Sequence, residues 1–308
     1  RKHSRCSVAM ATSDSASSLE AWLSLIVDAF TVVIGLMASL ELLSPTRLPQ
    51  LLRDALQFGK VRPAGRAWTA VQLLELPKQH FWHFYLAGLA CCACLLWAAS
   101  WPAGWLGGCL AAPLGLPDVS AAPWLSFTPL VLQACQMLRR LLECRLVSVY
   151  SSGSINLLHY GLGYGFYCCV VWSLLLRLPE YRISLAQAIA HSAVHALLAW
   201  GQFKAAQTLA ALRKDGKGAV IHRKHLLPQG HLFRYLSSPH YNLEMLIYLN
   251  LFCLVSGSGG GGGGLLFHLL LFVLVNQSAS ALLSHAWYRR QFGSSFPADR
   301  RALIPFVL

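Results

Sequence analysis

The chain has 308 residues, of which 56% are apolar and only 12% are charged, and its formal net charge is +13. Because soluble domains carry charge on about 25% of their residues, this composition excludes an ordinary soluble enzyme. Seven of the ten cysteines lie within apolar runs, where packing is the simplest role, so a disulfide framework is excluded as well.

Seven apolar runs divide the chain. A membrane-spanning helix needs about 20 largely apolar residues, and a helix satisfies its own backbone hydrogen bonds inside lipid. The runs cover residues 21–43, 81–99, 124–138, 157–176, 185–203, 241–255 and 265–283. We therefore predict an all-α, polytopic membrane helix bundle of about seven transmembrane helices. The third and sixth runs are short, so we expect their helices to continue beyond the lipid.

The basic residues indicate how this bundle is oriented. With seven spans, residues 44–79, 139–156, 204–240 and 284–308 share one side of the membrane, and they hold 20 of the 25 Lys and Arg residues. Loops rich in Lys and Arg stay in the cytosol. The sequence therefore predicts a lumenal N-terminus and a cytosolic C-terminus, with membrane lipids rather than nucleic acid beside the basic loops.

We expect one membrane domain over residues 20–308, preceded by a disordered tail over residues 1–19. Met10 opens a sequence typical of an initiation site, so a native start at Met10, which leaves residues 1–9 outside the native protein, is one alternative. The first apolar run is long enough to span the membrane and is not followed by a clear cleavage site, unlike an ordinary signal peptide.

Two motifs inside the apolar runs have competing interpretations. Gly161-x-Gly163-x-Gly165 matches part of a dinucleotide fingerprint, but no strand precedes it, and close approach of two helices is favoured. His191 and His195 lie one helical turn apart, as metal ligands do. Since a membrane di-iron site needs several further histidine boxes, we favour histidines bonded to neighbouring helices and predict no metal.

Polar and aromatic residues on the predicted cytosolic side exceed what contact with lipid headgroups requires. Residues 202–248 combine cations and tyrosines with Glu244, about one turn inside the sixth apolar run. An ionisable group at that depth is costly and usually faces a cavity or a partner, although snorkelling to the interface is an alternative. The closing segment from His285 adds stacked aromatics and arginines, so we expect it to be anchored as part of a site.

Several motifs lie between positions 68 and 308. They are Leu76-Pro77-Lys78, His83-Phe84-Tyr85, Leu138-Arg139-Arg140-Leu-Leu-Glu143-Cys144, Leu212-Arg213-Lys214, Pro228-x-Gly230, Phe233-x-Tyr235-Leu-Ser-Ser-Pro239-x-Tyr241-x-x-Glu244, His285-x-Trp287-Tyr288-x-x-x-Phe292 and Pro297-x-x-Arg300-x-x-Leu303-Ile304-Pro305-Phe306. Together they make the chain similar to the steroid 5α-reductase family, and residues 139–308 carry most of this resemblance. Within the family, the chain resembles the polyprenol reductase branch.

The resemblance implies a reaction. Family members use NADPH to saturate a carbon–carbon double bond conjugated to a carbonyl, with hydride reaching the β-carbon while an acid polarises the carbonyl oxygen. For this branch the substrate is the α-isoprene unit of polyprenol or polyprenal in the endoplasmic reticulum membrane, where dolichol synthesis supports protein N-glycosylation. A steroid 3-oxo-5α-reductase and a non-enzymatic lipid transporter or scaffold are the alternatives.

The resemblance also assigns residues. Glu75 matches the family's catalytic acid, whereas Met137 stands at the position of its partner tyrosine and cannot donate a proton. Arginines suit phosphates because they are permanently charged and bind in a bidentate manner. Lipid-headgroup contact is the alternative for Arg300, and we assign residues 304–306 to packing. The positions that match the family's NADPH site are Arg140, Gln202, Arg213, His240, Glu244, His285, Tyr288 and Arg300.

Overall fold

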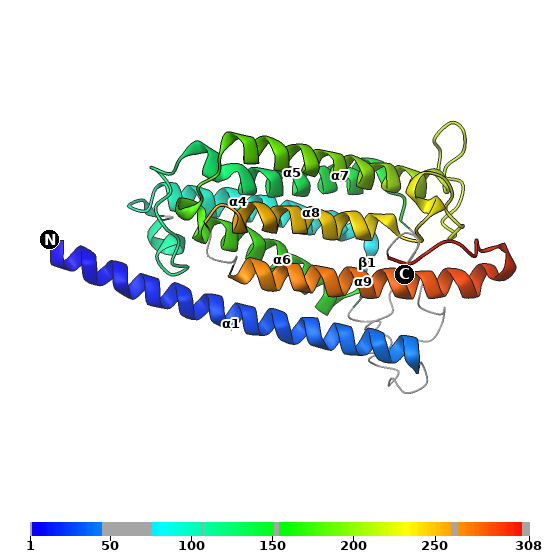
Figure 1. The fold of residues 1–308 in the computed structure, drawn as a ribbon, viewed down its shortest axis with the longest axis horizontal. Coiled ribbons are helices and arrows are strands. Elements are labelled where there is room, and N and C mark those ends of the chain that lie inside the picture. Colours follow the sequence, from blue (N-terminus) through cyan, green and yellow to red (C-terminus); the bar gives the residue numbers. More distant parts are fainter. Residues whose placement is uncertain (1, 45–74, 106, 151–153, 260–263, 304–308) are drawn as a thin grey trace.

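Within the residues that the computed structural model describes, seven long helices lie roughly along one axis (Figure 1). The structure describes residues 2–44, 75–105, 107–150, 154–259 and 264–303. Each long helix contains most or all of one predicted apolar run, so the predicted helix positions are confirmed. The helices are α1 (Lys2–Leu43), α4 (Trp82–Ser100), α5 (Thr128–Leu142), α6 (Leu157–Leu176), α7 (Leu185–Ala211), α8 (Pro239–Ser256) and α9 (Leu265–Phe292).

Three described segments are long and apolar enough to cross a membrane by themselves, and they cover residues 16–43, 78–100 and 265–295. The other long helices fall short of that measure. In the case of α5 the reason is plain, since the helix has only 15 residues and ends in a pair of arginines. The chain is thus mostly helical and contains at least three candidate membrane spans.

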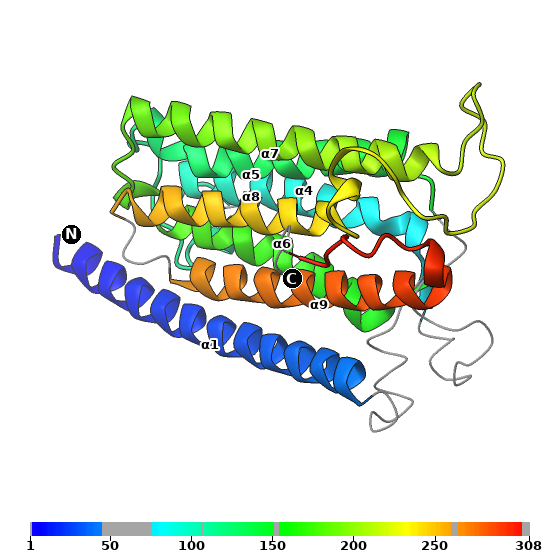
Figure 2. The same ribbon diagram turned by 45° about the vertical axis from the view of Figure 1, so that its right-hand side comes forward.

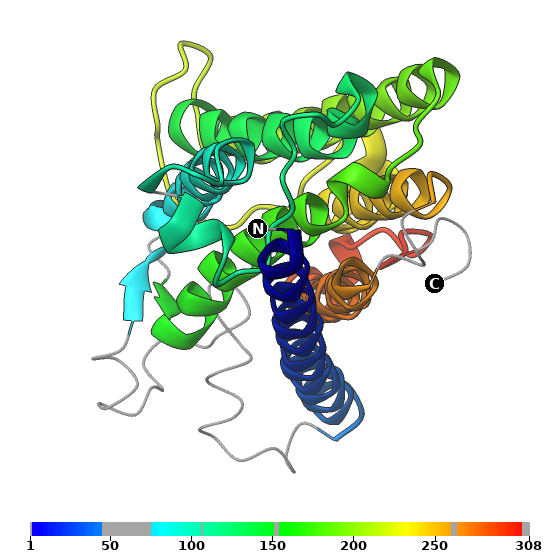
Figure 3. The same ribbon diagram turned by 90° about the vertical axis from the view of Figure 1, so that its left-hand side faces the viewer.

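Helix α1 begins at Lys2, whereas the sequence predicts a disordered tail over residues 1–19. The stretch from Lys2 to Glu20 contains neither proline nor glycine, the two residues that most strongly interrupt a helix. The helix therefore extends without a break beyond the apolar run. It packs chiefly on α9, and its C-terminal end runs out below the other helices when the molecule is seen end-on (Figure 3).

The other six helices form the body of the protein. Helix α4 packs on α5 and α6, α8 packs on α7 and α9, and α5 also contacts α6, α7 and α8 (Figure 2). The core extends across α4, α5, α6, α8 and α9, and long aliphatic side chains such as Leu174, Leu254 and Leu265 are completely buried in it. This packing holds α5 and α8 beside each other, which matters for the polar groups described below.

Loops from different parts of the chain meet at each end of the bundle. At one end Arg223 Nη1 donates to the Tyr150 carbonyl at 3.1 Å, and the Arg301 amide donates to the Tyr235 carbonyl at 2.9 Å. At the opposite end Glu20 accepts from the Leu265 amide at 2.9 Å and pairs with Arg177 at 3.1 Å. The three described basic segments therefore gather at one end, opposite Glu20.

A two-stranded antiparallel sheet interrupts the otherwise helical architecture. Strand β1 (Glu75–Pro77) pairs with β2 (Ser154–Asn156), with Glu75 opposite Asn156 and Leu76 opposite Ile155. Pro77 ends β1 just before a short 3₁₀ turn leads into α4, and β2 runs directly into α6. The sheet therefore fixes the starts of α4 and α6 next to each other.

The glycine motif of α6 departs from its predicted role. A methyl group at Gly163 would lie 3.1 Å from the Phe84 ring, so this glycine allows α4 to approach α6, as predicted. Methyl groups at Gly161 and Gly165 would meet nothing within 4 Å. The prediction of helix contact is therefore wrong for these two positions, because they face away from α4.

The two histidines of α7 behave differently from each other. His191 Nδ1 lies 2.8 Å from Asn250 Oδ1 on α8, which confirms the predicted bond to a neighbouring helix. His195 is buried, but neither of its ring nitrogens has a hydrogen-bond partner within the described residues, so the same prediction is wrong for His195. Its neighbours do not include enough ligands for a metal, as the described part of the chain holds no group of three or more potential metal ligands.

Candidate functional site

A hydrogen-bonded group of buried polar side chains joins three helices. Glu244 on α8 accepts, through Oε2, from the side-chain amide of Gln136 on α5 at 3.3 Å and from that of Gln202 on α7. The Gln202 amide also donates to the His240 carbonyl at 3.2 Å. Each of these three side chains belongs to a residue that is at most 7% exposed. Glu244 therefore faces protein partners, as the sequence predicts, and does not reach out to solvent.

Two arginines complete this polar network. Arg139 donates to Gln136 Oε1 at 2.8 Å and to Gln202 Oε1. Glu143, only 1% exposed, accepts from Arg139 and from Arg140 Nη1, the latter at 2.5 Å. The network thus contains two cations and two carboxylates, which offset one another at a depth where an unpaired charge is costly.

Sequence reasoning missed Gln136, Arg139 and Glu143 as members of this network. A signal for them existed, since spacings of three and four residues place all three on one face of a helix. On an otherwise apolar helix such a stripe indicates polar contacts with neighbouring helices. The sequence could not show that α7 and α8 supply the partners.

A cavity of 260 Å³ lies beside the network. Tyr85 on α4 lines this cavity and accepts a hydrogen bond from Arg140 Nε at 3.2 Å. Because the phenol oxygen accepts from Arg140, its own proton is available to another acceptor. We call this space the polar cavity. Its polar and aromatic lining includes Tyr85, Arg140, Tyr167, Tyr241, Glu244 and Tyr248.

The predicted acid Glu75 lies on β1, at the edge of this arrangement. It is half-buried and accepts from the Ser154 hydroxyl across the small sheet. Glu75 is not among the residues that line the polar cavity, whereas Ile155, one position along β2 from Ser154, does line it. The structure therefore places Glu75 near the cavity wall rather than within it.

Met137 occupies the interior of the bundle. It is completely buried, and a methyl group at Gly88 of α4 would collide with its sulfur. Gly88 lies one helical turn after Tyr85, and residues three apart share a helix face. Tyr85 is therefore close to the place where the resemblance expects a tyrosine, although it belongs to a different helix.

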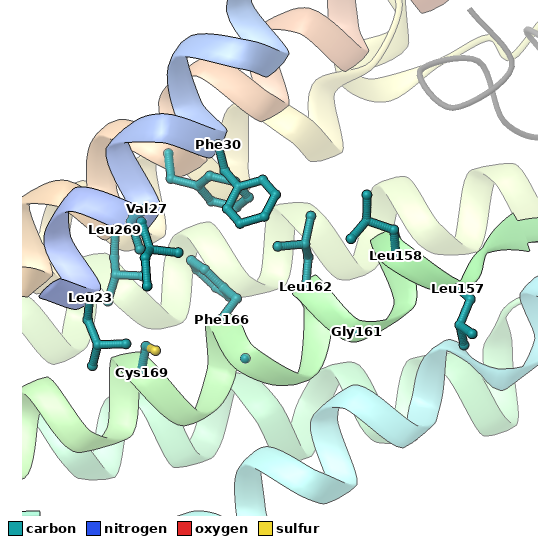
Figure 4. Close-up of a pocket in the computed structure, with 13 residues that line it drawn as sticks. Leu23, Val27, Phe30, Leu157, Leu158, Gly161, Leu162, Phe166, Cys169 and Leu269 are labelled. Carbon is teal, nitrogen blue, oxygen red and sulfur yellow. The ribbon is translucent and has the colours of Figure 1, made fainter. Parts of the chain in front are cut away.

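A second cavity of 540 Å³ lies between α1, α6 and α9 (Figure 4). It shares Leu162, Phe166 and Phe272 with the polar cavity, so these three side chains separate the two spaces. We call it the apolar cavity. Its lining residues are Leu23, Ile26, Val27, Phe30, Leu157, Leu158, Gly161, Leu162, Gly165, Phe166, Cys169, Leu269 and Phe272.

A third cavity of 720 Å³ is basic and lies at the end of α9. His285, Arg289, Arg300 and Arg301 line it. The Arg300 residue is only 3% exposed, yet Nε and Nη1 of its guanidinium have no hydrogen-bond partner within the described residues. Burial lowers the pKa of this guanidinium, so an anion bound beside it would compensate for lost hydration.

Tyr288 is buried and lies within electrostatic reach of Tyr241, Arg213 and Arg300. Tyr241 lines the polar cavity and Arg300 lines the basic cavity, whereas Tyr288 is not among the residues that line either one. The ring of Tyr241 lies 4.2 Å from that of His240. The structure thus brings predicted residues together as two groups, Arg140 with Glu244 in the polar cavity and His285 with Arg300 in the basic cavity.

Arg213 has a different environment from the other predicted cofactor residues. Its guanidinium donates to the carbonyls of Lys224, at 3.2 Å, and of Val149, and it lies 3.1 Å from His225. These contacts tie together the loops after α5 and α7. Arg213 therefore organises the end of the bundle, whichever ligand its charge also attracts.

The closing segment is anchored, as the sequence predicts. The Ser237 amide donates to the Arg301 carbonyl at 2.9 Å, and Asn242 donates to the Leu303 carbonyl. The ring of His285 also contacts this region, with Nδ1 2.8 Å from the Ser237 hydroxyl. Residues 304–306, which the sequence assigns to packing, lie outside the described residues.

Comparisons with known proteins identify the family of the chain. A family described as 3-oxo-5-alpha-steroid 4-dehydrogenase matches residues 158–308. Proteins named polyprenal reductase are 31% identical in Xenopus tropicalis and 32% identical in Xenopus laevis, and each match covers 84% of this chain and 89% or 86% of the relative. The human polyprenal reductase is 31% identical over 93% of this chain and 94% of its own length. The chain therefore belongs to the steroid 5α-reductase family.

Proposed function

We propose that this protein uses NADPH to saturate the α-isoprene double bond of polyprenal, the aldehyde form of a polyprenyl lipid. The relatives named polyprenal reductase, matched over most of the chain, suggest this substrate. The structural observation that carries the proposal is the shared wall between a cavity with buried polar groups and a cavity lined by apolar side chains. A substrate with a reactive carbonyl head and a long hydrocarbon tail needs both environments.

The basic cavity fits the phosphate groups of NADPH. The buried guanidinium of Arg300 carries donor groups that have no hydrogen-bond partner within the described residues, and His285, Arg289 and Arg301 line the same cavity. The 2′-phosphate of NADPH requires such a cation, whereas NAD lacks this phosphate and does not require one. When bound, NADPH supplies the hydride. Residues Tyr288 and Tyr241 would bind the cofactor along the path to the polar cavity, and Arg140 and Glu244 would bind its reactive end.

We assign polarisation of the substrate carbonyl to Tyr85. The phenol lines the polar cavity, and the hydrogen bond from Arg140 leaves its proton free to reach a carbonyl oxygen. The positive charge of Arg140 also stabilises the phenol as its proton is shared. Glu75 is the second candidate. It acts from the neighbouring sheet, and its bond with Ser154 orients its carboxyl group.

The membrane arrangement that fits this function has seven spans, a lumenal N-terminus and a cytosolic C-terminus in the endoplasmic reticulum. The meeting of the loops supports it, because residues 147–150, 213–225, 235–242 and 297–303 share one end of the bundle. Glu20, Arg177 and Leu265 share the other. An odd number of spans between these groups is consistent with both sets of contacts, and it leaves the basic cavity open to cytosolic NADPH.

The test is a reductase assay on microsomes from cells that express the chain. Polyprenal and NADPH should give a product heavier by two hydrogens, and NADPH should be oxidised in equal amount. A non-enzymatic transporter predicts neither change. Reduction of steroid enones without reduction of polyprenal would overturn the assignment in favour of the steroid branch.

A further inference from the structure

The apolar cavity has features that the chemistry at the reacting double bond does not require. Its thirteen lining residues, all within the described chain, include no charged side chain. Its volume of 540 Å³ lies within the range of about 300–1,000 Å³ found for small-molecule sites. Ile26, Leu158 and Gly161 are exposed, so the cavity opens to the side of the bundle.

Two glycines give this cavity its depth. Gly161 and Gly165 lie one turn apart on α6, and both line the cavity. Methyl groups added to either would meet nothing within 4 Å, so neither glycine is required for packing between helices. A helix normally disfavours glycine, because glycine loses more backbone freedom than other residues. Larger side chains at these two positions would therefore fill the empty space in front of α6.

The apolar cavity adjoins the polar cavity. Phe166 and Phe272 line both spaces, and their ring centroids are 5.7 Å apart. Phe166 also lies 5.4 Å, between centroids, from Tyr248 in the polar cavity. A hydrocarbon chain attached to a carbonyl in the polar cavity therefore enters the apolar cavity as soon as it passes these rings.

We propose that the apolar cavity holds the isoprene units next to the reacting head, and that Gly161 and Gly165 allow long polyprenyl chains to bind. This inference rests on the proposed function. The lipid bilayer is as apolar as the cavity, so transfer of the chain from lipid contributes little binding energy. The volume of the cavity instead determines which substrates react. If the chain of a substrate cannot enter the cavity, its carbonyl head cannot reach the catalytic groups.

The experiment fills the space and compares two substrates. The double variant Gly161→Leu, Gly165→Leu is assayed in microsomes with a long-chain polyprenal and with a five-carbon enal that contains only the reacting isoprene unit. Leucine favours helix more than glycine does, so α6 should fold normally. We expect kcat/KM for the long substrate to fall at least about tenfold, while that for the short substrate stays unchanged.

Two further variants keep the result interpretable. The double alanine variant at the same positions adds only one carbon at each and should give a smaller loss. Gly108→Leu is the matched control, since Gly108 also faces open space but lies in the connection after α4, away from the cavity. It should leave both substrates unaffected.

The possible outcomes separate the two proposals. The inference is overturned if the double leucine variant reduces both substrates as the wild type does, or if its kcat/KM falls equally for both substrates. In either case the cavity does not hold the chain. If the wild type reduces neither substrate, the proposed function itself fails. Loss confined to the long substrate supports the inference.

Discussion

The polar network and the apolar cavity place opposite demands on the sequence. In the network, Gln136, Gln202 and Glu244 each have named partners at hydrogen-bonding distance, so a change of one group leaves another unsatisfied. In the apolar cavity the side chains contribute only through their shape and volume, so changes that conserve volume are usually tolerated. Precision at the head of the substrate and tolerance along its tail suit a lipid whose reacting end is unique and whose chain is repetitive.

The largest expected effect tests the polar side of this comparison at Tyr85. Tyr85→Phe removes the phenol oxygen and keeps the ring, so we expect kcat to fall about 100-fold or more while KM for polyprenal changes little. Steady-state kinetics in detergent micelles measure both quantities. Tyr181→Phe, a buried tyrosine at the opposite end of the bundle, is the control.

A different result would reassign the acid. If Tyr85→Phe retains full kcat and Glu75→Gln abolishes it, Glu75 is the proton donor and Tyr85 only shapes the cavity. If both substitutions lower kcat, the two groups act together across the gap between α4 and β1.

The next effect concerns the centre of the network. The side-chain amides of Gln136 and Gln202 both donate to the Glu244 carboxylate. Glu244→Gln puts a third amide at this place, so one acceptor is lost, and we expect kcat/KM to fall about 10- to 100-fold. The variant should remain folded in size-exclusion chromatography, because the shape of the side chain is kept. Glu180→Gln, a half-exposed carboxylate elsewhere, should behave like the wild type. Wild-type turnover in Glu244→Gln would remove the network from the proposed site.

A smaller effect is expected in the basic cavity. Arg300→Met keeps an unbranched side chain and removes the charge, so KM for NADPH should rise about tenfold while KM for NADH stays unchanged. The ratio of the two constants reports the 2′-phosphate specifically. Arg182→Met at the opposite end is the control. Equal changes for both cofactors would contradict a phosphate contact and favour a structural role.

The smallest effect belongs to a polar contact outside both regions. Asn250 exchanges hydrogen bonds with His191 across α7 and α8, at 2.8 Å and 3.1 Å. Interhelical hydrogen bonds in membrane proteins contribute about 0.6 kcal/mol on average, so Asn250→Leu should lower the melting temperature only slightly and leave turnover intact. A loss of activity would show that the network extends as far as this pair.

Hydropathy alone locates the helices, because an apolar run of sufficient length has few other stable forms in lipid. The same information does not show which face of a helix meets which neighbour. For this reason the role of Gly163 is predicted correctly and the roles of Gly161 and Gly165 are not. The network is hidden for a similar reason, since Gln136 and Gln202 are far apart in sequence and ordinary in composition. Tyr85 requires the structure, because its nearness to Met137 depends on the packing of α4 on α5.

The attachment of α1 bears on how quickly a substrate of great length could bind. Glu20 fastens this helix to Arg177 and Leu265 at one end, while four of its side chains, from Leu23 to Phe30, form one wall of the apolar cavity. A tunnel closed on all sides would force a polymer to thread through it end first, and threading slows as the polymer lengthens. A cavity with an open side lets the polymer be laid in along its flank, so the association rate need not depend on how many units follow the head.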